Sequence, residues 1–565
     1  MTKPTKLELT WIGKENRPRL EPRILIEDPA KSCHAPFRVS DKDVFDNRLI
    51  FGDNLLALKA LEQEFAEKIK CIYIDPPYNT GSAFTHYEDG VEHSLWLSLI
   101  RDRLEILRRL LVTNGSIWVS IDDREQAYLR VLMDEVFGRD CFVACNVWQK
   151  RYSRENREAI GDAHEYVLVY AKDPAVFKAE RNLLPLQKKQ RKVYGNPNND
   201  SRGPWQSVSL LAQGYRPNQM YEIIAPSGRH HVPPPGNCWK VIRAEYDKLI
   251  RDRRVYFGKD GNGVPRRMHF LSDATGVVPW TWWPHEDVGH TGEAKNEAND
   301  LFGADVSFGT PKPERLMRQV LAIATNPDDW VLDSFAGSGT TGAVAHKMGR
   351  RWIMVELGEH CHTHIIPRLK KVVDGEDKGG ITEAMGWKGG GGFRYYRLAP
   401  SLLQKDQFGN WVINRKYNAA MLAEAVCKLE GFAYGPSDTV YWQHGRSTEK
   451  DFIYVTTQTL AREQIEKLSD EVGEGRSLLI LCGAFRVRNL DEFPNLTVKK
   501  IPKAVLSRCE WGKDDYSLEI RSLPIRQPEE KEMTDDGKPR SKEERRATVQ
   551  QPSLFDLPAG KGGAK

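Results

Sequence analysis

The sequence predicts an α/β protein built around a doubly wound sheet, and two segments carry this prediction. Residues 45–172 alternate apolar, strand-like runs with amphipathic, helix-like stretches, and residues 306–378 return to the same periodicity. Within the second segment, the apolar run 330–333 leads into a glycine-rich loop and then into a helix-like stretch. Strand, glycine loop and helix in this order are typical of sheets that bind nucleotides or dinucleotides. Because 565 residues exceed what one hydrophobic core supports, we expect two or three domains.

The first elements in chain order are an arm and one half of the main sheet. Residues 1–44 are polar and contain several prolines, which indicates an N-terminal arm. In residues 45–172 the helix-like stretch 94–111 places leucines and isoleucines where they can pack on a sheet, and a strand is expected at 164–171. Residues 173–305 are irregular and rich in Pro, Gly, Trp and Arg, so they indicate an inserted recognition region rather than more sheet.

The remaining segments complete the sheet and add a smaller domain. Apolar runs at 451–455 and 477–481 predict strands of that domain. The composition then becomes charged and contains prolines, which is typical of disorder. The units expected here are the second half of the main domain (306–378), a flexible glycine-rich junction (379–399), a C-terminal α/β domain (400–522) and a disordered tail (523–565).

The most informative motif is Asp75-Pro76-Pro77-Tyr78, which follows the apolar run 71–74. Each proline fixes its own φ and biases the preceding residue toward extended geometry, so the loop is rigid. The Asp75 carboxylate and the Pro76 carbonyl can each accept a hydrogen bond from an exocyclic amino group. The Tyr78 ring offers a stacking face. The motif therefore predicts a site for a flat base that carries an amino group.

The glycine-rich loop, residues 334–341, is the second signal. Its glycines let the backbone approach a ligand closely, and the helix that follows supplies free N–H groups. The loop lacks the Gly-Lys-Ser/Thr ending of a phosphate-binding NTPase loop, and it matches the dinucleotide spacing only formally. The next apolar run, 352–355, ends at Glu356, whose carboxylate could accept hydrogen bonds from ribose hydroxyls.

Together these motifs resemble those of the amino-group DNA methyltransferases that use S-adenosylmethionine. The Asp-Pro-Pro-Tyr motif precedes the Phe-x-Gly-x-Gly-Thr-Thr motif, an order similar to that of the circularly permuted β group. Within that group the chain is most similar to the modification subunits of type III restriction–modification systems, and the resemblance covers residues 5–400. Further segments that resemble the family lie at 48–54, 115–123, 164–171 and 310–314, and those typical of type III subunits at 291–303 and 389–396.

This resemblance implies a Rossmann-like methyltransferase sheet with circularly permuted motif order, an inserted DNA-recognition region and a smaller C-terminal α/β domain. It also implies transfer of a methyl group to N6 of an adenine that is flipped out of duplex DNA. Tyr78 would stack on the base, while Asp75 and the carbonyl of Pro76 accept the N6 hydrogens and Pro77 completes the rigid loop. The residues implied for S-adenosylmethionine are Asp333, Phe335, Gly337, Gly339 and Thr340, with Glu356 on the ribose, Thr310 and Lys312 at the amino-acid end, and Asp53 as a further candidate.

Several alternatives remain open at this point. A cytosine-N4 methyltransferase uses the same machinery but more often carries Ser at the position of Asp75. Methyltransferases that act on RNA or on protein amides use a related loop that usually opens with Asn. The chain could also be a solitary adenine methyltransferase without a restriction partner. The alternative outside enzymes is a recognition module that reads DNA for a partner nuclease–helicase.

The distribution of basic residues, rather than the net charge, supports DNA binding. The net charge is only +5, so a nucleic-acid footprint must be confined to part of the surface. Basic residues gather between the two motifs and are interleaved with tryptophan and tyrosine, which suits neutralisation of phosphates, although a solvated charged face has the same pattern. The candidate DNA-binding residues are Lys150, Arg151, Lys188, Lys189, Arg191, Lys192, Arg253 and Arg254.

The sequence indicates neither a metal site nor a membrane segment. Residues 360–364 contain three histidines and a cysteine, but their spacing does not match zinc ligands, so no metal is expected. The nine cysteines form no disulfide-like framework, and we find neither a signal peptide nor an apolar run long enough to span a bilayer. These features predict a protein of the bacterial cytoplasm or nucleoid, without membrane partners.

The partners implied by the resemblance are duplex DNA, a type III restriction (Res) subunit and a second copy of the chain. The tail offers a further candidate, because residues 551–557 resemble the short peptide that docks replication proteins onto the sliding clamp. In that peptide Gln551 would anchor one end, and Leu554 and Phe555 would fill an apolar pocket. A chance match, or packing of this pair on the C-terminal domain, is the alternative.

Overall fold

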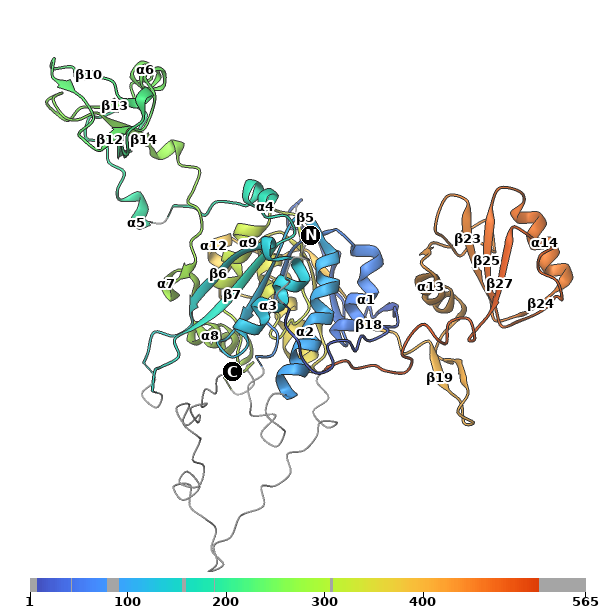
Figure 1. Ribbon diagram of the computed structural model, residues 1–565. Coiled ribbons are helices and arrows are strands. Elements are labelled where there is room, and N and C mark those ends of the chain that lie inside the picture. The colour runs from blue at the N-terminus through green and yellow to red at the C-terminus, as the bar shows by residue number, and fades with distance from the viewer. Residues whose placement is uncertain are drawn as a thin grey trace, which may run out of the picture.

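The computed structural model describes residues 8–41, 43–78, 91–154, 159–186, 188–304 and 308–517. Figure 1 shows a central α/β body with two smaller units beside it, one inserted within the body's sequence and one C-terminal to it. Within the described ranges, no helix combines the length and the apolar character needed to cross a bilayer.

The central body is built on one 11-stranded sheet in the order β1-β18-β3-β17-β16-β4-β5-β7-β6-β15, with β2 also paired to β18. All neighbours from β18 to β5 are parallel, whereas β7 runs antiparallel between β5 and β6. The strands are β1 (Leu25–Glu27), β2 (Cys33–His34), β3 (Asn47–Phe51), β4 (Ile69–Ile74), β5 (Leu111–Ile121), β6 (Phe142–Gln149), β7 (His164–Ala171), β15 (Trp282–Trp283), β16 (Trp330–Asp333), β17 (Arg351–Glu356) and β18 (Gly392–Leu398).

Helices cover both faces of this sheet, so its inner strands are apolar along their whole length. Successive residues of β4 divide between two buried clusters: Ile72 and Ile74 join one face, while Cys71 and Tyr73 join the other. The first face is covered by α1 to α3 and the second by α9 to α11. The helices of the body are α1 (Asn54–Phe65), α2 (Val91–Leu110), α3 (Gln126–Phe137), α4 (Pro174–Glu180), α7 (His285–Val288), α8 (Thr291–Phe302), α9 (Glu314–Ala324), α10 (Thr340–Lys347), α11 (Ile366–Val373) and α12 (Thr382–Met385).

The sheet has a topological switch point between β16 and β4. From β4 the chain passes through α2 to β5 on one side, and from β16 it passes through α10 to β17 on the other. Ligands of open α/β sheets bind outside the carboxyl ends of the strands at such a point. The parallel pairing of Val331 with Cys71 and of Leu332 with Ile72 brings the two predicted motifs together there, although they are far apart in the sequence.

Two segments that were expected outside the sheet belong to it. Residues 25–34 form β1 and β2 rather than an arm, and the glycine-rich junction contains β18, which lies between β1 and β3. The arm was expected because β1 and β2, of three and two residues, are too short to show periodicity, and the junction because its glycines dominate the sequence before β18. The glycines serve close packing instead of mobility: Gly391 has a φ of +71°, and a Cβ there would lie 2.7 Å from the carbonyl oxygen of Val44.

The inserted unit is smaller than the region 173–305 that was expected. At its two ends α4 packs on β5, β15 extends the sheet beside β6, and α7 packs on α9. Between them a separate unit with its own small core projects from the body (Figure 1). Its elements are α5 (Lys188–Arg191), β8 (Trp205–Ser209), β9 (Leu211–Gln213), β10 (Ile223–Ile224), β11 (His230–His231), β12 (Asn237–Trp239), α6 (Arg243–Arg251), β13 (Val255–Tyr256) and β14 (Arg266–Phe270).

The C-terminal unit contains a five-stranded sheet in the order β21-β22-β23-β25-β27, and the two strands predicted for it are β23 and β25. The elements are β19 (Leu403–Lys405), β20 (Trp411–Ile413), α13 (Ala419–Glu430), β21 (Ala433–Tyr434), β22 (Gly445–Arg446), β23 (Asp451–Val455), β24 (Thr459–Ala461), α14 (Arg462–Val472), β25 (Ser477–Cys482), β26 (Ala484–Arg486) and β27 (Leu496–Lys500). The predicted tail 523–565, with Gln551, Leu554 and Phe555, lies outside the described residues.

A buried ion network joins α9, α10 and α11 beneath the glycine-rich loop. The carboxylate of Glu314 accepts hydrogen bonds from Lys347 at 2.8 and 2.9 Å and from Arg368 at 2.9 Å. Arg368 also donates to the hydroxyl of Thr340 at 2.8 Å, and Lys347 pairs with Asp377 at 2.7 Å. The network therefore fixes the start of α10 against the neighbouring helices.

Replacing Glu314 with Ala should destabilise the central body by about 3–5 kcal/mol, because Lys347 and Arg368 would stay buried after losing a carboxylate. Differential scanning calorimetry measures this as a lower unfolding temperature. Glu376→Ala, at an exposed position near the same helices, is the matched control and should change little. A loss below about 1 kcal/mol in the Glu314 variant would contradict the role assigned to the network.

Candidate active site

The Asp-Pro-Pro-Tyr loop leaves the end of β4 and is held against α2. The indole Nε1 of Trp96 donates a hydrogen bond to the carbonyl oxygen of Pro77 at 2.6 Å. Pro76 is buried, and the side chain of Tyr78 packs against the core on the α2 side of the sheet. Two prolines and this anchor leave the loop little freedom, so Asp75 is presented at the carboxyl edge of the sheet.

A cluster of charged side chains surrounds Asp75. The ammonium of Lys312 lies 2.6 Å from Asp75 Oδ2 and 3.7 Å from Glu165 Oε2. The hydroxyl of Tyr78 donates to the same Glu165 oxygen at 3.0 Å, and Lys150 approaches the other Glu165 oxygen at 3.3 Å. Burial alone would lower the pKa of Lys312, but the neighbouring Asp75 and Glu165 raise it. Burial, Asp75 and Glu165 raise the pKa of Tyr78, so its hydroxyl stays protonated and can donate.

Glu165 is a site residue that the sequence did not single out. It was part of a predicted strand, and nothing marked its side chain as functional. The available signal was its place near the start of β7: because β7 runs antiparallel to its neighbours, its first residues lie at the carboxyl edge of the parallel strands. An acidic residue there, 8% exposed and next to an apolar strand, is a candidate for the site.

Lys312 and Lys150 both make ion pairs that the sequence did not predict. Lys312 was assigned to the amino-acid end of the cofactor, yet its ammonium pairs with Asp75 because two carboxylates converge on it. Lys150 was assigned to DNA phosphates, yet it is 8% exposed and pairs with Asp162 at 2.6 Å as well as with Glu165. Thr310 is exposed and lines the same cavity as Lys312.

The glycine-rich loop connects β16 to α10 as the sequence predicted. Gly337 and Gly339 have φ values of +54° and +77°, and a Cβ on Gly339 would meet Ile365 at 3.0 Å, so both positions require glycine. Asp333 ends β16 and accepts hydrogen bonds from the Thr341 hydroxyl at 2.6 Å and from the Phe335 amide at 2.9 Å. Burial nevertheless raises the pKa of Asp333 to about 7.

Glu356 lies at the end of β17 and faces the glycine-rich loop. Its Oε2 accepts a hydrogen bond from the Gly337 amide at 2.9 Å, and its Oε1 accepts one from the Gly358 amide at 2.8 Å. Burial alone would raise the pKa of Glu356, but His360 and these amides lower it, so the group is ionised near neutral pH. A charged carboxylate at this position is an acceptor for hydroxyl groups of a ligand.

Two adjoining cavities open at the switch point, with volumes of about 620 and 420 Å³. The larger contains Tyr78, Glu165, Lys312 and the glycine-rich loop, while the smaller contains Glu356 and the apolar side chains of Leu99, Val355 and Leu357. The residues that line both cavities are Asp75, Pro77, Phe308, Phe335 and Gly337. Residues of the predicted base motif and of the predicted cofactor motif therefore line both cavities, which share a wall.

Asp53 lines the smaller cavity, but its carboxylate is engaged by the protein. Its Oδ1 accepts a hydrogen bond from the Leu56 amide at 3.0 Å and so caps α1, and its Oδ2 accepts one from the Tyr516 amide at 2.9 Å. Arg103 lies 3.4 Å from the same Oδ2. The three donors give this carboxylate a structural role, and its direct contact with a cofactor stays a prediction.

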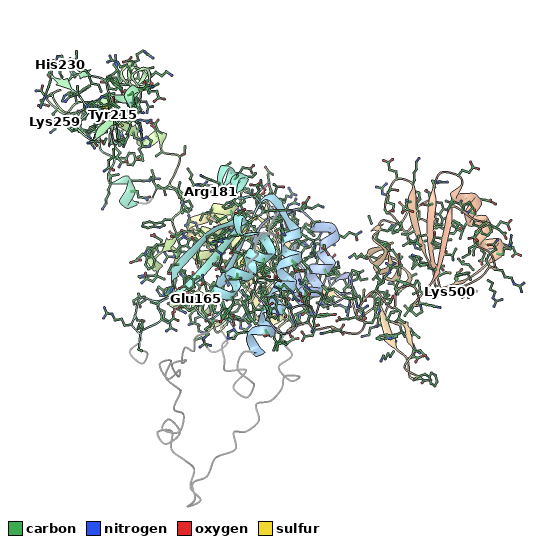
Figure 2. All side chains as sticks on the ribbon, viewed as in Figure 1. Glu165, Arg181, Tyr215, His230, Lys259 and Lys500 are labelled. Atoms are coloured by element: carbon green, nitrogen blue, oxygen red, sulfur yellow. The ribbon has the colours of Figure 1, made fainter. Side chains whose placement is uncertain are left out.

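The other predicted DNA-binding residues lie at the larger cavity and on the inserted unit. Arg151 is exposed and lines the larger cavity, and Arg191, Lys192 and Arg253 are exposed on the inserted unit. Arg254 is instead paired with Asp273. The side chains of Lys188 and Lys189 lie outside the described residues. Figure 2 shows Tyr215, His230 and Lys259 on the inserted unit, away from Glu165 in the body.

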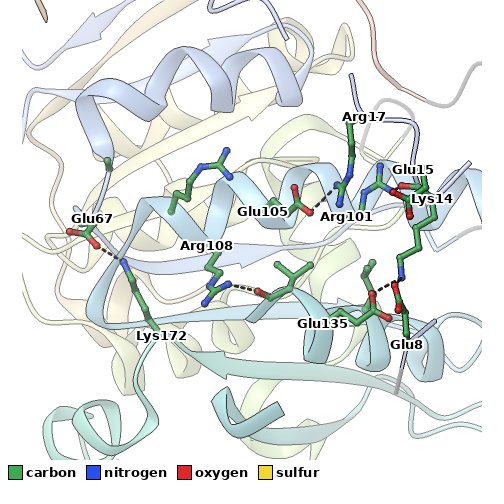
Figure 3. Close-up of a pocket in the computed structure, with 14 residues that line it drawn as sticks. Glu8, Lys14, Glu15, Arg17, Glu67, Arg101, Glu105, Arg108, Glu135 and Lys172 are labelled. Atoms are coloured by element: carbon green, nitrogen blue, oxygen red, sulfur yellow. Dashed lines mark hydrogen bonds and ion pairs between the residues drawn. The ribbon is translucent and has the colours of Figure 1, made fainter. Parts of the chain in front are cut away.

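A third cavity, of about 820 Å³, lies near the opposite ends of the strands (Figure 3). Several of its charged residues pair with one another: Lys172 with Glu67 at 2.8 Å, Arg17 with Glu105 at 2.9 Å, and Lys14 with a glutamate of α3. None of the predicted site residues lines this cavity.

One group of possible metal ligands occurs among the described residues, namely Asp123, Asp162 and His164. Two of the three already have protein partners at short distance, because Asp162 pairs with Lys150 at 2.6 Å and Asp123 accepts a hydrogen bond from Tyr166 at 2.8 Å. The cation of Lys150 occupies the place next to Asp162 that a metal would need. We assign no metal to this group.

Comparison with known families identifies the chain. The profile of the family described as DNA methylase (N6_N4_Mtase) matches residues 69–367, a range that contains both motifs and most of the sheet. The chain belongs to this DNA methylase family. Among curated proteins, the chain is 36% identical over 332 residues to the type III restriction-modification enzyme StyLTI Mod subunit of Salmonella typhimurium, covering 52% of this chain and 49% of that protein.

Two further comparisons concern another curated relative and a solved structure. The chain is 33% identical over 425 residues to the probable type III HindVI Mod subunit of Haemophilus influenzae, covering 64% of this chain and 55% of that protein. The chain thus spans about half the length of these two curated relatives. Among solved structures, the PvuII DNA methyltransferase (cytosine-N4-specific) matches with 14% identity and a TM-score of 0.33, over 62% of this chain and 94% of that one.

Proposed function

We propose that this DNA methylase transfers a methyl group from S-adenosyl-L-methionine to N6 of an adenine that is flipped out of duplex DNA. The observation that carries the proposal is the pair of adjoining cavities, one with the Asp-Pro-Pro-Tyr loop and one with an ionised glutamate, which share Asp75 as a wall. This arrangement suits a target base and a nucleoside cofactor that must meet at one point. Bound S-adenosylmethionine supplies an electrophilic methyl group on its sulfonium.

The residues around the smaller cavity and the glycine-rich loop fit this cofactor. The buried hydroxyl of Ser334 lines the smaller cavity and has no partner among the described residues, so it can bind a polar group of a ligand. Glu356 would accept hydrogen bonds from the ribose, and Asp333 would hold the positively charged end of the cofactor. The backbone of the glycine-rich loop, which includes Gly339, would approach it closely. The cavity-lining residues that complete this set are Phe335, Gly337, Thr340 and Thr310.

The larger cavity would receive the base. The N6 lone pair of adenine is delocalised into the ring, so the amine is a poor nucleophile until its hydrogens are bound by acceptors. Asp75 and the carbonyl of Pro76 would accept them, and Tyr78 would stack on the ring. Asp75 first has to release Lys312. Glu165 makes this possible, because its carboxylate lies 3.7 Å from the same ammonium and can keep that charge paired. These residues would then position the N6 amine of the adenine for attack on the methyl group.

The identity of residue 75 favours adenine N6 over the alternative targets. Cytosine-N4 enzymes more often carry Ser at the position of Asp75, and methyltransferases that act on amides usually carry Asn there.

We further propose that the chain is the modification subunit of a type III system, with a restriction subunit as partner, because the two relatives described above are Mod subunits. A homodimer, binding of the sliding clamp by residues 551–557 and a place in the bacterial cytoplasm belong to the same proposal. Single-molecule sequencing of host DNA tests the proposed methylation, because it gives the modified base and its sequence context together.

The first prediction concerns Asp75. Replacing it with Ala should lower the rate of methyl transfer by about 10²–10⁴-fold. The Kd for S-adenosylmethionine should change little, because the carboxylate acts on the amine. A tritiated-methyl assay and calorimetry measure the two effects. Tyr78→Phe is the matched mild variant: it keeps the ring and loses the bond to Glu165, whereas Tyr78→Ala should also lose stacking worth about 1–3 kcal/mol. Activity near the native level in Asp75→Ala would refute the mechanism.

A second prediction follows from the raised pKa of Asp333, about 7 in the free protein. Below this pH the carboxyl is protonated, and above it the carboxylate attracts the positively charged cofactor. Affinity for S-adenosylmethionine should therefore rise about tenfold between pH 6 and pH 8, following the ionised fraction. Asp333→Asn should remove this part of the pH dependence. Calorimetric titration at several pH values compares the two proteins, and identical profiles would contradict the prediction.

A third prediction concerns sequence recognition by the inserted unit, which carries exposed basic residues and the exposed ring of Tyr215. Exchanging residues 188–280 for the equivalent unit of a methylase with another target site should move methylation to that site and leave cofactor affinity unchanged. Sequencing of the methylated DNA and calorimetry provide the two measurements. A chimera that still methylates the original sequence would place recognition elsewhere in the chain.

A further inference from the structure

The chain returns to the central body after the C-terminal unit and runs along its N-terminal segment. The guanidinium of Arg19 donates to the carbonyl oxygen of Ser507 at 2.8 Å, and the amide of Glu510 donates to the carbonyl oxygen of Arg19 at 2.8 Å. Arg23, which is 2% exposed, pairs with Asp514 at 2.7 Å and donates to the carbonyl oxygen of Lys513 at 3.1 Å. Residues 507–514 are thus docked by hydrogen bonds rather than merely lying on the surface.

This returning segment ends on a buried carboxylate. The amide of Tyr516 donates to Asp53 Oδ2 at 2.9 Å across 463 residues of sequence. Arg103 contacts the same Oδ2 at 3.4 Å and donates to the carbonyl oxygen of Tyr516 at 3.3 Å. Asp53 is 1% exposed and Arg103 is 2% exposed, while Tyr516 is 9% exposed and belongs to the core on the α2 side of the sheet. We call Asp53, Arg103 and Tyr516 the C-terminal joint.

The C-terminal joint forms part of the smaller cavity. Asp53, Arg103 and Ser517 line that cavity together with Asp75 and Glu356. The joint is also linked to the glycine-rich loop, because Arg103 donates to the side-chain oxygen of Asn54. The side-chain amide of Asn54 (Nδ2) in turn donates to the carbonyl oxygen of Ser334 at 2.7 Å. A continuous chain of hydrogen bonds thus connects residue 516 to the loop after β16.

We infer that the returning segment completes the cofactor cavity through Ser517, and that Asp53, Arg103 and Tyr516 are positioning residues for cofactor binding. The inference rests on the proposed function. A buried carboxylate is costly when it loses a donor, so Asp53 holds the returning segment in place and the segment in turn satisfies Asp53. Without the Tyr516 amide, Arg103 and Asn54 would have to rearrange around Asp53, and the wall that they form beside Ser334 would be lost.

The test uses the full chain with substitutions at Tyr516. Tyr516→Pro removes the N–H group that Asp53 accepts, and the Kd for S-adenosylmethionine should rise at least about tenfold. The KM for the cofactor should rise with it, while kcat at saturating cofactor stays within about twofold, because Asp75 and Tyr78 are not touched. Tyr516→Phe is the matched control: it keeps the amide and the ring, loses only the bond to Glu510, and should bind the cofactor as the native protein does.

Hydrogen exchange by mass spectrometry supplies a readout that does not depend on turnover. Addition of S-adenosylmethionine to the native protein should slow exchange both in peptides covering 333–340 and in those covering 510–517. Protection at 333–340 without any at 510–517, together with native affinity in Tyr516→Pro, would overturn this inference and leave the proposed function intact. Absence of protection at both places would instead overturn the proposed function, on which the inference depends.

A loss of folding must be separated from a loss of cofactor affinity. The melting temperature of the protein without cofactor should fall by only a few degrees in Tyr516→Pro, whereas the increase that S-adenosylmethionine produces should shrink strongly at a fixed concentration. If the variant melts lower but keeps the full cofactor-induced increase, Tyr516 has only a structural role and the inference is wrong.

Discussion

The parallel pairing of β16 with β4 is the constraint on which the site depends. Neither the Asp-Pro-Pro-Tyr loop nor the glycine-rich loop forms a site alone, and the two lie at opposite ends of the matched family region. Hydrogen bonding between their strands places both loops at the same carboxyl edge, where the connections turn to opposite sides. The permuted order of the motifs therefore does not alter the site. The site requires that the two strands be neighbours in the sheet, whichever of them comes first in the sequence.

The charges inside the larger cavity obey a second constraint. Two carboxylates, Asp75 and Glu165, share the ammonium of Lys312, and removal of either would leave a buried charge without a full partner. A neutral base can enter such a cluster only if the cation keeps a counter-ion while Asp75 turns to the amine. Glu165 provides that counter-ion, so the pairing of Asp75 in the protein without ligand is compatible with its proposed role. It also means that Glu165 acts through Lys312 and Tyr78 and need not touch the base.

The sequence predicted the inner sheet and both loops because their information is local. An apolar run followed by two prolines or by spaced glycines predicts a strand and a loop wherever it occurs, and β4, β16 and β17 lie where they were expected. Glu165 was missed because its meaning depends on the direction of β7 relative to its neighbours, which no local pattern records. The contact between Asp53 and the amide of Tyr516 could not be predicted for a related reason: the two residues lie 463 positions apart in the sequence. The edge strands β1 and β15 are too short to show a period.

Arg23 shows how the far end of the chain becomes part of the central body. Its guanidinium donates to the carbonyl oxygen of Ala399, where the chain leaves for the C-terminal unit, and pairs with Asp514, where the chain returns. One buried cation therefore fixes both connections of that unit to a point beside β1. Residues 515–517 lie beyond this point on the cavity side, so the same anchor that fixes the C-terminal unit delivers its last residues to Asp53.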